Sequence, residues 1–568
     1  MSLDELLLKG GEVLDGTGAP AVRADVRVRG GRIVEVGADL RPGGGSTFDA
    51  SGATVAPGFI DSHAHTDPLV FWDPTVDPDP LHGVTTMLVG NCGLSLYPVT
   101  EATRGEISDL FAYIEDVPRH LFDDCVPWTW SDYAGYRDRV NATGAGVNLA
   151  GLVGHSPLRL AVMGAEAWSR VATADERAGI AALLSRAMAD GAWGLSTSQL
   201  DVDAQGRPVP SLVADAAEVD ALLDVVAASG SGLVELVPAL LDPVDAKAAV
   251  EDLARRCGSR GVPLTWTGFT HSQTNPSSTE AWVELARQLQ SEGVALYPQL
   301  SPRTVDFRLN WDSSMLFMSM PEGWHRVIAA RGEDKARLLG DPAWRAVARG
   351  EWDRVEKAMF PHRRPELVRF VEVHGAPNEQ WLGRTLADAI AERGGHPSDV
   401  LADFVLANDC RPGVVAQGMA NADVAGVGRT LADPAVLISS SDAGAHMQML
   451  CSSGDTTLVL TRHVRERGDL SLEQAVHELT GRQAAAFGFR RRGVIAPGNV
   501  ADLTVFALDE LHYDRDEFVH DLPGGGSRLR RPAGGYRATF VAGVAVQVDG
   551  SPTGALPGRA IGSHDGEG

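Results

Sequence analysis

The sequence predicts an α/β fold: a (β/α)8 barrel of the TIM type with a small β-sandwich built from both ends of the chain. Three observations support this prediction. Apolar strand-like runs alternate with helical patterns through most of the 568 residues. Short β-rich runs separated by glycine turns occupy both ends. Histidines stand at the carboxyl end of the first central apolar run, where parallel barrels carry their functional side chains.

The two ends of the chain are predicted to share one sheet domain. β-rich runs in the first fifty residues recur near the end in 500–506 and 538–546. We therefore assign residues 1–54 and 490–550 to a composite β-sandwich. The Gly- and Pro-rich segment 551–568 is expected to be a disordered tail. The early strand candidates are 6–9, 13–14, 24–29, 32–36 and 47–49.

Residues 55–489 are predicted to form the barrel. Helical patterns such as 174–190, 216–228 and 279–292 separate the apolar runs, which is typical of βα units in a parallel sheet. Eight such units close a (β/α)8 barrel. The eight strand candidates are 55–60, 85–89, 147–153, 192–197, 232–237, 263–270, 294–299 and 436–440.

One interval, about 302–411, interrupts this alternation. It has helical character and many Trp, Arg and Glu residues, and it is too long for a loop without structure of its own. An insertion on the loop face of a barrel is a candidate lid or pocket wall.

Composition restricts the partners of this chain. The hydrophobic fraction of 44% and charged fraction of 22% are those of a globular protein, and no apolar run of twenty residues could form a membrane helix. A net charge of −25, spread along the chain, opposes nucleic-acid binding, which needs clustered Lys and Arg. We expect a small-molecule substrate, no nucleic acid and no membrane, and leave homo-oligomerisation open.

Cysteine usage and the first residues predict a cytoplasmic location. The five cysteines are odd in number and scattered, which argues against a disulfide framework and for a reducing compartment. The start, Met1-Ser2-Leu3-Asp4-Glu5, lacks the basic and apolar regions of a secretory signal.

His63 and His65 are the most informative residues. On an extended strand, side chains two residues apart project from one face, about 6–7 Å apart at the backbone, so both imidazoles can bind one metal ion. The pair alone is weak, because surface or core histidines produce the same pattern. Its place at the end of the apolar run 55–60 favours a hydrolytic metal site.

Three further strand ends carry reactive side chains: Cys92 after the second strand, His271 after the sixth and Asp442 after the eighth. A thiolate is a strong Zn²⁺ ligand, and an aspartate can act as a general base. Taken singly, Cys92 could be an apolar core residue and Asp442 a helix N-cap. Strand ends that together supply His, Cys, His and Asp are hard to explain by coincidence.

These motifs resemble the D-aminoacylase (N-acyl-D-amino-acid deacylase) branch of the amidohydrolase superfamily. The resemblance rests on Pro57-Gly58-Phe59-Ile60-Asp61-x-His63-x-His65, on Gly90-Asn91-Cys92-Gly93, which is its most specific part, and on Ser441-Asp442. The segment 492–503 resembles the superfamily's return into the β-sandwich. The likeness covers nearly the whole chain, including the insertion.

The resemblance implies a zinc-dependent hydrolase that cleaves the amide bond of an N-acylated small molecule. His63 and His65 would hold one metal ion, and Cys92 and His271 another. Asp442 would take a proton from the attacking water and pass it to the leaving nitrogen. Zn²⁺, as one or two ions, would activate water at neutral pH and polarise the scissile carbonyl.

Strand five departs from the D-aminoacylase pattern. The family carries a histidine ligand there, whereas this chain has Leu233-Val234-Glu235-Leu236-Val237. Either Glu235 binds the metal as a carboxylate, or the site has fewer ligands and one metal. If the strand register differs by one residue, Glu235 turns away and is a paired structural carboxylate.

Gln273 is the second departure, because the family has a lysine there that meets the substrate carboxylate. Glutamine carries no charge. Arg303 could supply the charge through a bidentate pair, or it lies on the surface; Tyr297, shortly before it, is a candidate pocket residue. The substrate is therefore expected either to lack an α-carboxylate or to reach another cation. Only four lysines occur, none on a predicted barrel strand, which disfavours a carbamylated-lysine metal bridge.

Three other histidines have weaker signals. His155, after strand three, resembles a Gly-His-x-x-Leu-Arg element of the family and is a candidate substrate-binding residue, although a supporting role is favoured. His446, four residues after Asp442, either lines the pocket or is a loop histidine. His82 is expected to pack in the interior.

Three functional hypotheses follow. The first is a metal-dependent amidase acting on an N-acylated small molecule. The second keeps the metal but cleaves a cyclic amide, carbamate or ester. The third is a non-catalytic amidohydrolase-like scaffold. Glu235 and Gln273 favour it, and the intact set of His63, His65, Cys92, His271 and Asp442 opposes it.

Overall fold

The computed structural model describes residues 5–239, 243–439 and 441–564 and confirms the predicted barrel. Its parallel strands form two hydrogen-bonded runs, with β8 and β9 together making the third position. A parallel bridge between Ala64 and Ala443, with a 2.6 Å bond from His65 N to Ala443 O, joins the first strand position to the eighth. The strands are β6 (Phe59–Asp61), β7 (Val84–Val89), β8 (Asn148–Gly151), β9 (Val153–Gly154), β10 (Gly194–Ser198), β11 (Leu233–Val237), β12 (Leu264–Phe269), β13 (Leu296–Leu300) and β17 (Leu437–Ile438).

Local sequence explains where the barrel helices begin. α5 (Ala174–Ala189) starts with a capping box between Thr173 and Glu176, which satisfies backbone N–H groups of its first turn. α6 (Ala216–Ala228) is capped by the Asp215 carboxylate, and α8 (Pro276–Ser291) has proline in its first turn. These helices coincide closely with the predicted ones.

The other helices around the barrel lie in the loops and after the last strand. They are α1 (Arg104–Ile114), α2 (His120–Asp124), α3 (Tyr133–Thr143), α4 (His155–Met163), α7 (Pro243–Gly258), α14 (Val424–Leu431), α15 (Asp455–Leu458), α16 (Leu472–Leu479) and α17 (Gly481–Phe487). Within the described residues, no helix is both long and apolar enough to cross a bilayer.

Strands from both ends of the chain share one nine-stranded sheet with its own apolar core. The predicted strand 55–60 is divided between this sheet and the barrel at Gly58. A Cβ at Gly58 would lie 2.2 Å from the Thr85 side chain, so the bend needs glycine. The strands are β1 (Glu5–Val13), β2 (Val22–Arg29), β3 (Arg32–Gly37), β4 (Ser46–Asp49), β5 (Thr54–Pro57), β18 (Leu503–Phe506), β21 (Ala538–Val541), β22 (Val544–Val548) and β23 (Ser551–Pro552).

The segment after Ser551 is ordered, contrary to the expectation from its composition. β24 (Ala560–Ile561) pairs in parallel with β8, beside the barrel strands. The Trp193 indole N–H donates to the Ile561 carbonyl at 3.0 Å. Backbone pairing with a distant strand thus orders a stretch whose Gly and Pro content suggested disorder; residues 565–568 lie outside the described part.

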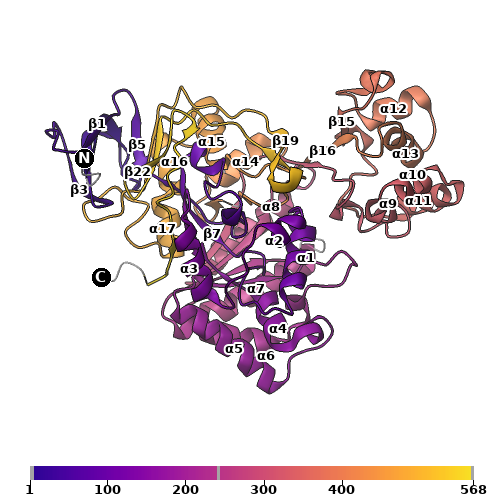
Figure 1. The fold of residues 1–568 in the computed structure, drawn as a ribbon, viewed down its shortest axis with the longest axis horizontal. Coiled ribbons are helices and arrows are strands. Elements are labelled where there is room, and N and C mark those ends of the chain that lie inside the picture. The colour runs from indigo at the N-terminus through magenta and orange to yellow at the C-terminus, as the bar shows by residue number, and fades with distance from the viewer. Residues whose placement is uncertain (1–4, 240–242, 440, 565–568) are drawn as a thin grey trace.

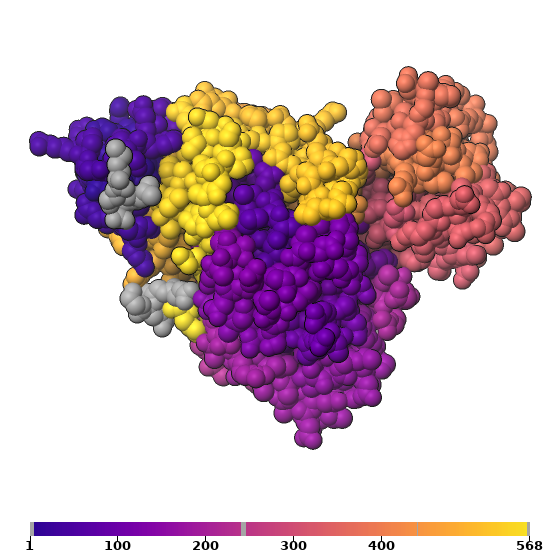
Figure 2. All heavy atoms as spheres, in the orientation of Figure 1, coloured from indigo at the N-terminus to yellow at the C-terminus, as the bar shows by residue number. Residues whose placement is uncertain are grey.

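The insertion forms a separate lobe, on the side of the barrel away from the terminal sheet (Figures 1 and 2). Five of its tryptophans pack within the lobe's own core, so they do not form the pocket wall expected from composition. Its elements are β14 (Val305–Arg308), α9 (Trp324–Ala329), α10 (Glu333–Gly340), α11 (Pro342–Arg354), β15 (Val368–Glu372), α12 (Leu386–Arg393) and α13 (Pro397–Ala407), and β14, β15 and β16 (Gly413–Ala420) make a three-stranded antiparallel sheet.

Candidate metal and active site

His63, His65 and Cys92 converge at the carboxyl end of the barrel. The Cys92 Sγ lies 3.4 Å from His63 Nε2 and 3.5 Å from His65 Nε2. Both imidazoles are buried. Among the described residues, these three form the set whose ligand atoms all lie within 4.8 Å of one another. Two imidazoles and a thiol are a donor set suited to Zn²⁺.

The Gly-Asn-Cys-Gly turn holds the thiol in place. Cys92 has a positive φ of 56°, flanked by Gly90 and Gly93, which also have positive φ. The Asn91 amide donates to the Ala64 carbonyl at 3.0 Å and to the Leu88 carbonyl at 2.8 Å. Asn91 therefore ties the turn that carries Cys92 to the strand end that carries both histidines.

Asp442 faces the same cluster, as the sequence predicts for a base. Its Oδ1 lies 3.5 Å from His63 Nε2 and 3.4 Å from His65 Nε2. Burial would raise the pKa of Asp442, but the two imidazoles hold that pKa well below its ordinary value. His446 lies beside the other carboxylate oxygen: its Nε2 is 3.6 Å from Asp442 Oδ2.

Glu235 points into the barrel but lies outside the three-residue set. One carboxylate oxygen accepts the Cys92 backbone N–H at 2.8 Å, and the other lies 3.9 Å from His63 Nδ1. Complete burial raises the pKa of Glu235 to about 7. In this arrangement Glu235 contacts the Cys92 backbone and the Nδ1 side of His63, and not the atoms that would bind a metal.

Glu115 is a site residue that the strand-end search missed. Its carboxylate lies 3.3 Å from His65 Nδ1, on the ring edge away from Cys92. It is buried, and burial followed by the nearby Asp442 raises its pKa well above the ordinary value. Glu115 caps the end of α1 rather than a strand, so the pattern of strand ends contained no signal for it.

His271 and Gln273 are directed toward the start of α14 and toward β16. His271 Nε2 lies 3.3 Å from the Asp423 carboxylate, and its backbone N–H donates to the Asn421 side chain at 2.6 Å. The Gln273 amide donates to the Gly418 carbonyl at 2.9 Å. The structure does not bring His271 into the set formed by His63, His65 and Cys92.

Arg303 is largely buried beside the site and is already paired. It donates to the Ser441 carbonyl at 2.6 Å and to the Asp455 carboxylate at 2.8 Å. Tyr297 packs against Phe487 of α17, with ring centroids 6.4 Å apart, and does not line the cavity beside Cys92. Arg303 therefore lies close to Asp442 without facing the cavity, and Tyr297 is remote from it.

His155 and His82 are buried and hydrogen-bonded away from the cluster. The two His155 nitrogens lie 3.0 Å from the Thr197 hydroxyl and 2.8 Å from the Glu218 carboxylate, which also binds Arg159. His82 Nδ1 lies 2.8 Å from the Thr457 hydroxyl. His155 therefore makes its hydrogen bonds away from the cluster, and His82 packs in the interior.

A cavity of about 630 Å³ opens beside the cluster. Cys92, Asp442, His446 and Glu115 form part of its polar wall. The rest is mainly apolar and includes Met315 and Met359 from the insertion. The insertion therefore supplies part of the wall of the candidate active site.

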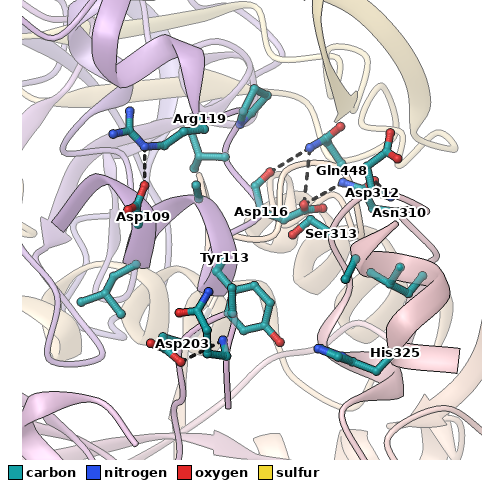
Figure 3. Close-up of a pocket in the computed structure, with 18 of the residues that line it drawn as sticks. Asp109, Tyr113, Asp116, Arg119, Asp203, Asn310, Asp312, Ser313, His325 and Gln448 are labelled. Carbon is teal, nitrogen blue, oxygen red and sulfur yellow. Dashed lines mark hydrogen bonds and ion pairs between the residues drawn. The ribbon is translucent and has the colours of Figure 1, made fainter. Parts of the chain in front are cut away.

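A second cavity, of about 550 Å³, lies between α1 and the insertion (Figure 3). Figure 3 shows Asp116 held by Asn310 and Gln448, and Tyr113 directed toward His325. Asp116 accepts from the Asn310 amide at 2.8 Å. Because Asp116 follows Glu115 in the chain, the second cavity adjoins the first through this short segment.

Comparison with known proteins identifies the family of this chain. Residues 46–547 match the model of the amidohydrolase family. A D-aminoacylase of Alcaligenes xylosoxydans xylosoxydans is 29% identical over 98% of this chain and 97% of its own. An uncharacterised Mycobacterium tuberculosis protein is also 29% identical, over 95% of this chain and 90% of its own.

Solved structures give the same result. A D-aminoacylase crystal structure has a TM-score of 0.68 and 27% identity, covering 98% of this chain and 100% of that one. An N-acyl-D-glutamate deacylase from Bordetella bronchiseptica, complexed with zinc and a phosphonate inhibitor, has a TM-score of 0.67 and 26% identity, covering 99% and 100%. The chain therefore belongs to the amidohydrolase family of enzymes that hydrolyse amide bonds, and it is similar over nearly its whole length to D-aminoacylases.

Proposed function

We propose that this protein is a zinc-dependent deacylase that hydrolyses the N-acyl bond of a small molecule. The observation that carries the proposal is the convergence of His63, His65 and Cys92 with Asp442 on the wall of a large cavity. These three side chains would hold the ion. Bound Zn²⁺ supplies activation of water and polarisation of the scissile carbonyl.

The residues of the chain perform the remaining steps. The Asp442 carboxylate, unprotonated because the histidines lower its pKa, accepts a proton from the attacking water. It then donates that proton to the amide nitrogen as the carbon–nitrogen bond breaks. Glu115 orients His65 through Nδ1, and Glu235 holds the Cys92 backbone.

Relatives support the choice of bond. Three curated relatives from Alcaligenes xylosoxydans xylosoxydans are named D-aminoacylase, N-acyl-D-aspartate deacylase and N-acyl-D-glutamate deacylase. An L-hydantoinase from Arthrobacter aurescens, with a TM-score of 0.54 and 16% identity, shares only the fold. We therefore place an open-chain N-acyl bond ahead of a cyclic amide.

Metal content and activity, measured together, test the proposal. The purified protein is expected to contain zinc by elemental analysis, and chelation should abolish amide hydrolysis until zinc is restored. Cys92→Ala should lose both metal and activity. Cys125→Ala is the matched control, because Cys125 is a free cysteine outside the cluster. Full zinc occupancy in Cys92→Ala, or hydrolysis that survives chelation, would contradict the proposal.

A further inference from the structure

The cavity beside the metal cluster is apolar and acidic. Its titratable lining residues include three carboxyl groups, those of Glu115, Asp201 and Asp442, and the His446 imidazole; no lysine or arginine occurs among the described residues that line it. Burial raises the pKa of Asp201 to about 6, as expected where carboxylates lie close together without a cation. The apolar wall consists largely of Trp266, Phe269, Trp282, Phe307, Met315, Met359, Met419 and Met449.

The two side chains considered for binding a substrate carboxylate, Arg303 and Gln273, already have partners. Arg303 is engaged by the Asp455 carboxylate and the Ser441 carbonyl. The Gln273 amide donates to the Gly418 carbonyl, and this residue does not line the cavity. A carboxylate placed against this wall would lose its hydration without gaining a charged partner there, which is unfavourable.

The apolar wall can take a bulky group of variable shape. Four methionines line it, two of them from the insertion, and methionine adapts to irregular apolar surfaces because its side chain is flexible and polarisable. Aromatic rings on the barrel side, Trp266 and Phe269 of β12, provide a firmer surface. This combination favours binding through shape and apolar contact rather than through charge.

We propose that the preferred substrate is a neutral N-acyl compound with a bulky apolar group, and not an N-acyl amino acid with a free α-carboxylate. This inference rests on the proposed function, because it names the substrate class of the same site. It differs from what the names of the relatives would suggest, and the reason is the charge of the cavity wall.

A matched pair of compounds tests the inference. N-acetyl-leucine and N-acetyl-leucinamide have the same acyl group and side chain and differ in the carboxylate; both are assayed as D and L forms with the zinc-loaded enzyme. We expect kcat/KM for the amide to exceed that for the acid by at least about tenfold. The acid would lose hydration without the charge-assisted contact that could offset this loss, and one such contact is worth about that factor. An acid that reacts as well as the amide would overturn the inference.

Binding separates this inference from the proposed function. Zinc-loaded Asp442→Asn, which should bind without turnover, is titrated with the same compounds by calorimetry. Tighter binding of the amide supports the inference even if the wild-type enzyme hydrolyses neither compound, a result that would count against the deacylase function alone. Equal or tighter binding of the acid, or no binding of either, would contradict the inference.

A cation introduced into the wall should change the preference. Met419 lies half-buried on β16, so a lysine there can extend its ammonium group into the cavity. Met419→Lys is expected to shift the ratio of kcat/KM toward the acid by about tenfold. Met419→Gln is the matched control, because it is polar and uncharged, and it should leave the ratio near that of the wild type. An unchanged ratio in the lysine variant would overturn the inference.

Discussion

At the scale of residues, the site depends on where a few polar groups point. His63, His65 and Cys92 present their ligand atoms to one another, whereas Glu115 and Glu235 lie on the outer sides of the imidazoles. A carboxylate on the second nitrogen of a ligating histidine fixes the orientation of its ring. The carboxyl groups around the cluster therefore hold the three donor atoms in an orientation in which they can bind a cation.

Asp442 provides the test of the chemical step. Asp442→Asn removes the group that accepts the water proton but keeps its size, so the variant should retain zinc and lose about 10²-fold or more in kcat. Steady-state kinetics with parallel elemental analysis measures both. A kcat near that of the wild type would remove Asp442 from the mechanism. If zinc is lost as well, Asp442 contributes to holding the metal.

At the scale of elements, the insertion has two roles. Most of its aromatic residues stabilise its own core, where Trp324 packs against Phe317, Trp344 and Trp352. Only its edge, including Met315 and Met359, reaches the active-site cavity. A lobe that folds around its own core can thus present a small apolar edge without being reorganised by the substrate.

The two methionines should govern substrate affinity. Met315→Ala with Met359→Ala removes apolar contact worth roughly 1 kcal/mol per side chain, so KM for an apolar substrate should rise about tenfold or more. The value of kcat should change less, because neither residue touches the cluster. Met318→Ala is the control, since Met318 lies in the insertion but does not line the cavity. An unchanged KM in the double variant would show that this edge is peripheral.

Asp116 links α1 to the insertion and should make stability depend on pH. It is buried, and burial raises its pKa well above the ordinary value although Asn310 and Gln448 donate to its carboxylate. Below about pH 4 the carboxyl is protonated in both the folded and the unfolded chain, so its ionisation does not lower the free energy of unfolding. As pH rises, the unfolded chain releases the proton first, so the wild type loses stability.

Asp116→Asn lacks this titration, which gives a direct comparison. The variant should gain stability relative to the wild type as pH rises from about 4 toward neutrality, and the difference should vanish in acid. Denaturant unfolding at a series of pH values measures it. A difference in stability that does not vary with pH would show that Asp116 is ionised in the folded protein.

At the scale of the whole molecule, the chain ends hold the architecture together. The N- and C-terminal parts share the nine-stranded sheet. β24 then continues to the barrel, where Ala560 pairs with Leu149 and the Ser563 backbone N–H donates to the Gly191 carbonyl at 2.9 Å. The last strand thus covers an edge of β8 that would otherwise be unpaired.

Removal of the C-terminal strand should weaken the barrel. A chain that ends after Pro552 loses β24 and exposes the edge of β8, so its melting temperature should fall by at least about 2 °C and its tendency to aggregate should rise. A chain that ends after His564 keeps every described contact of this segment and should melt like the full-length protein. Equal melting of both truncations would show that β24 adds nothing to stability.

The sequence by itself determined the barrel, the terminal sheet and the strand-end residues His63, His65, Cys92 and Asp442. Periodicity of apolar residues is a local property, and parallel strands bring their carboxyl ends to one face, so spacing along the chain was sufficient. The position of a residue at the end of a strand did not determine where its side chain points, however. His271 also follows a strand but points toward Asp423.

Only the tertiary structure decided which polar groups surround the cluster and how the cavity is charged. Glu115 comes from the end of a helix, Arg303 is neutralised by Asp455, and the insertion's tryptophans pack on one another. The order of the segment after Ser551 likewise depends on a strand hundreds of residues away. These features arise from contacts between distant parts of the chain, which no local pattern records.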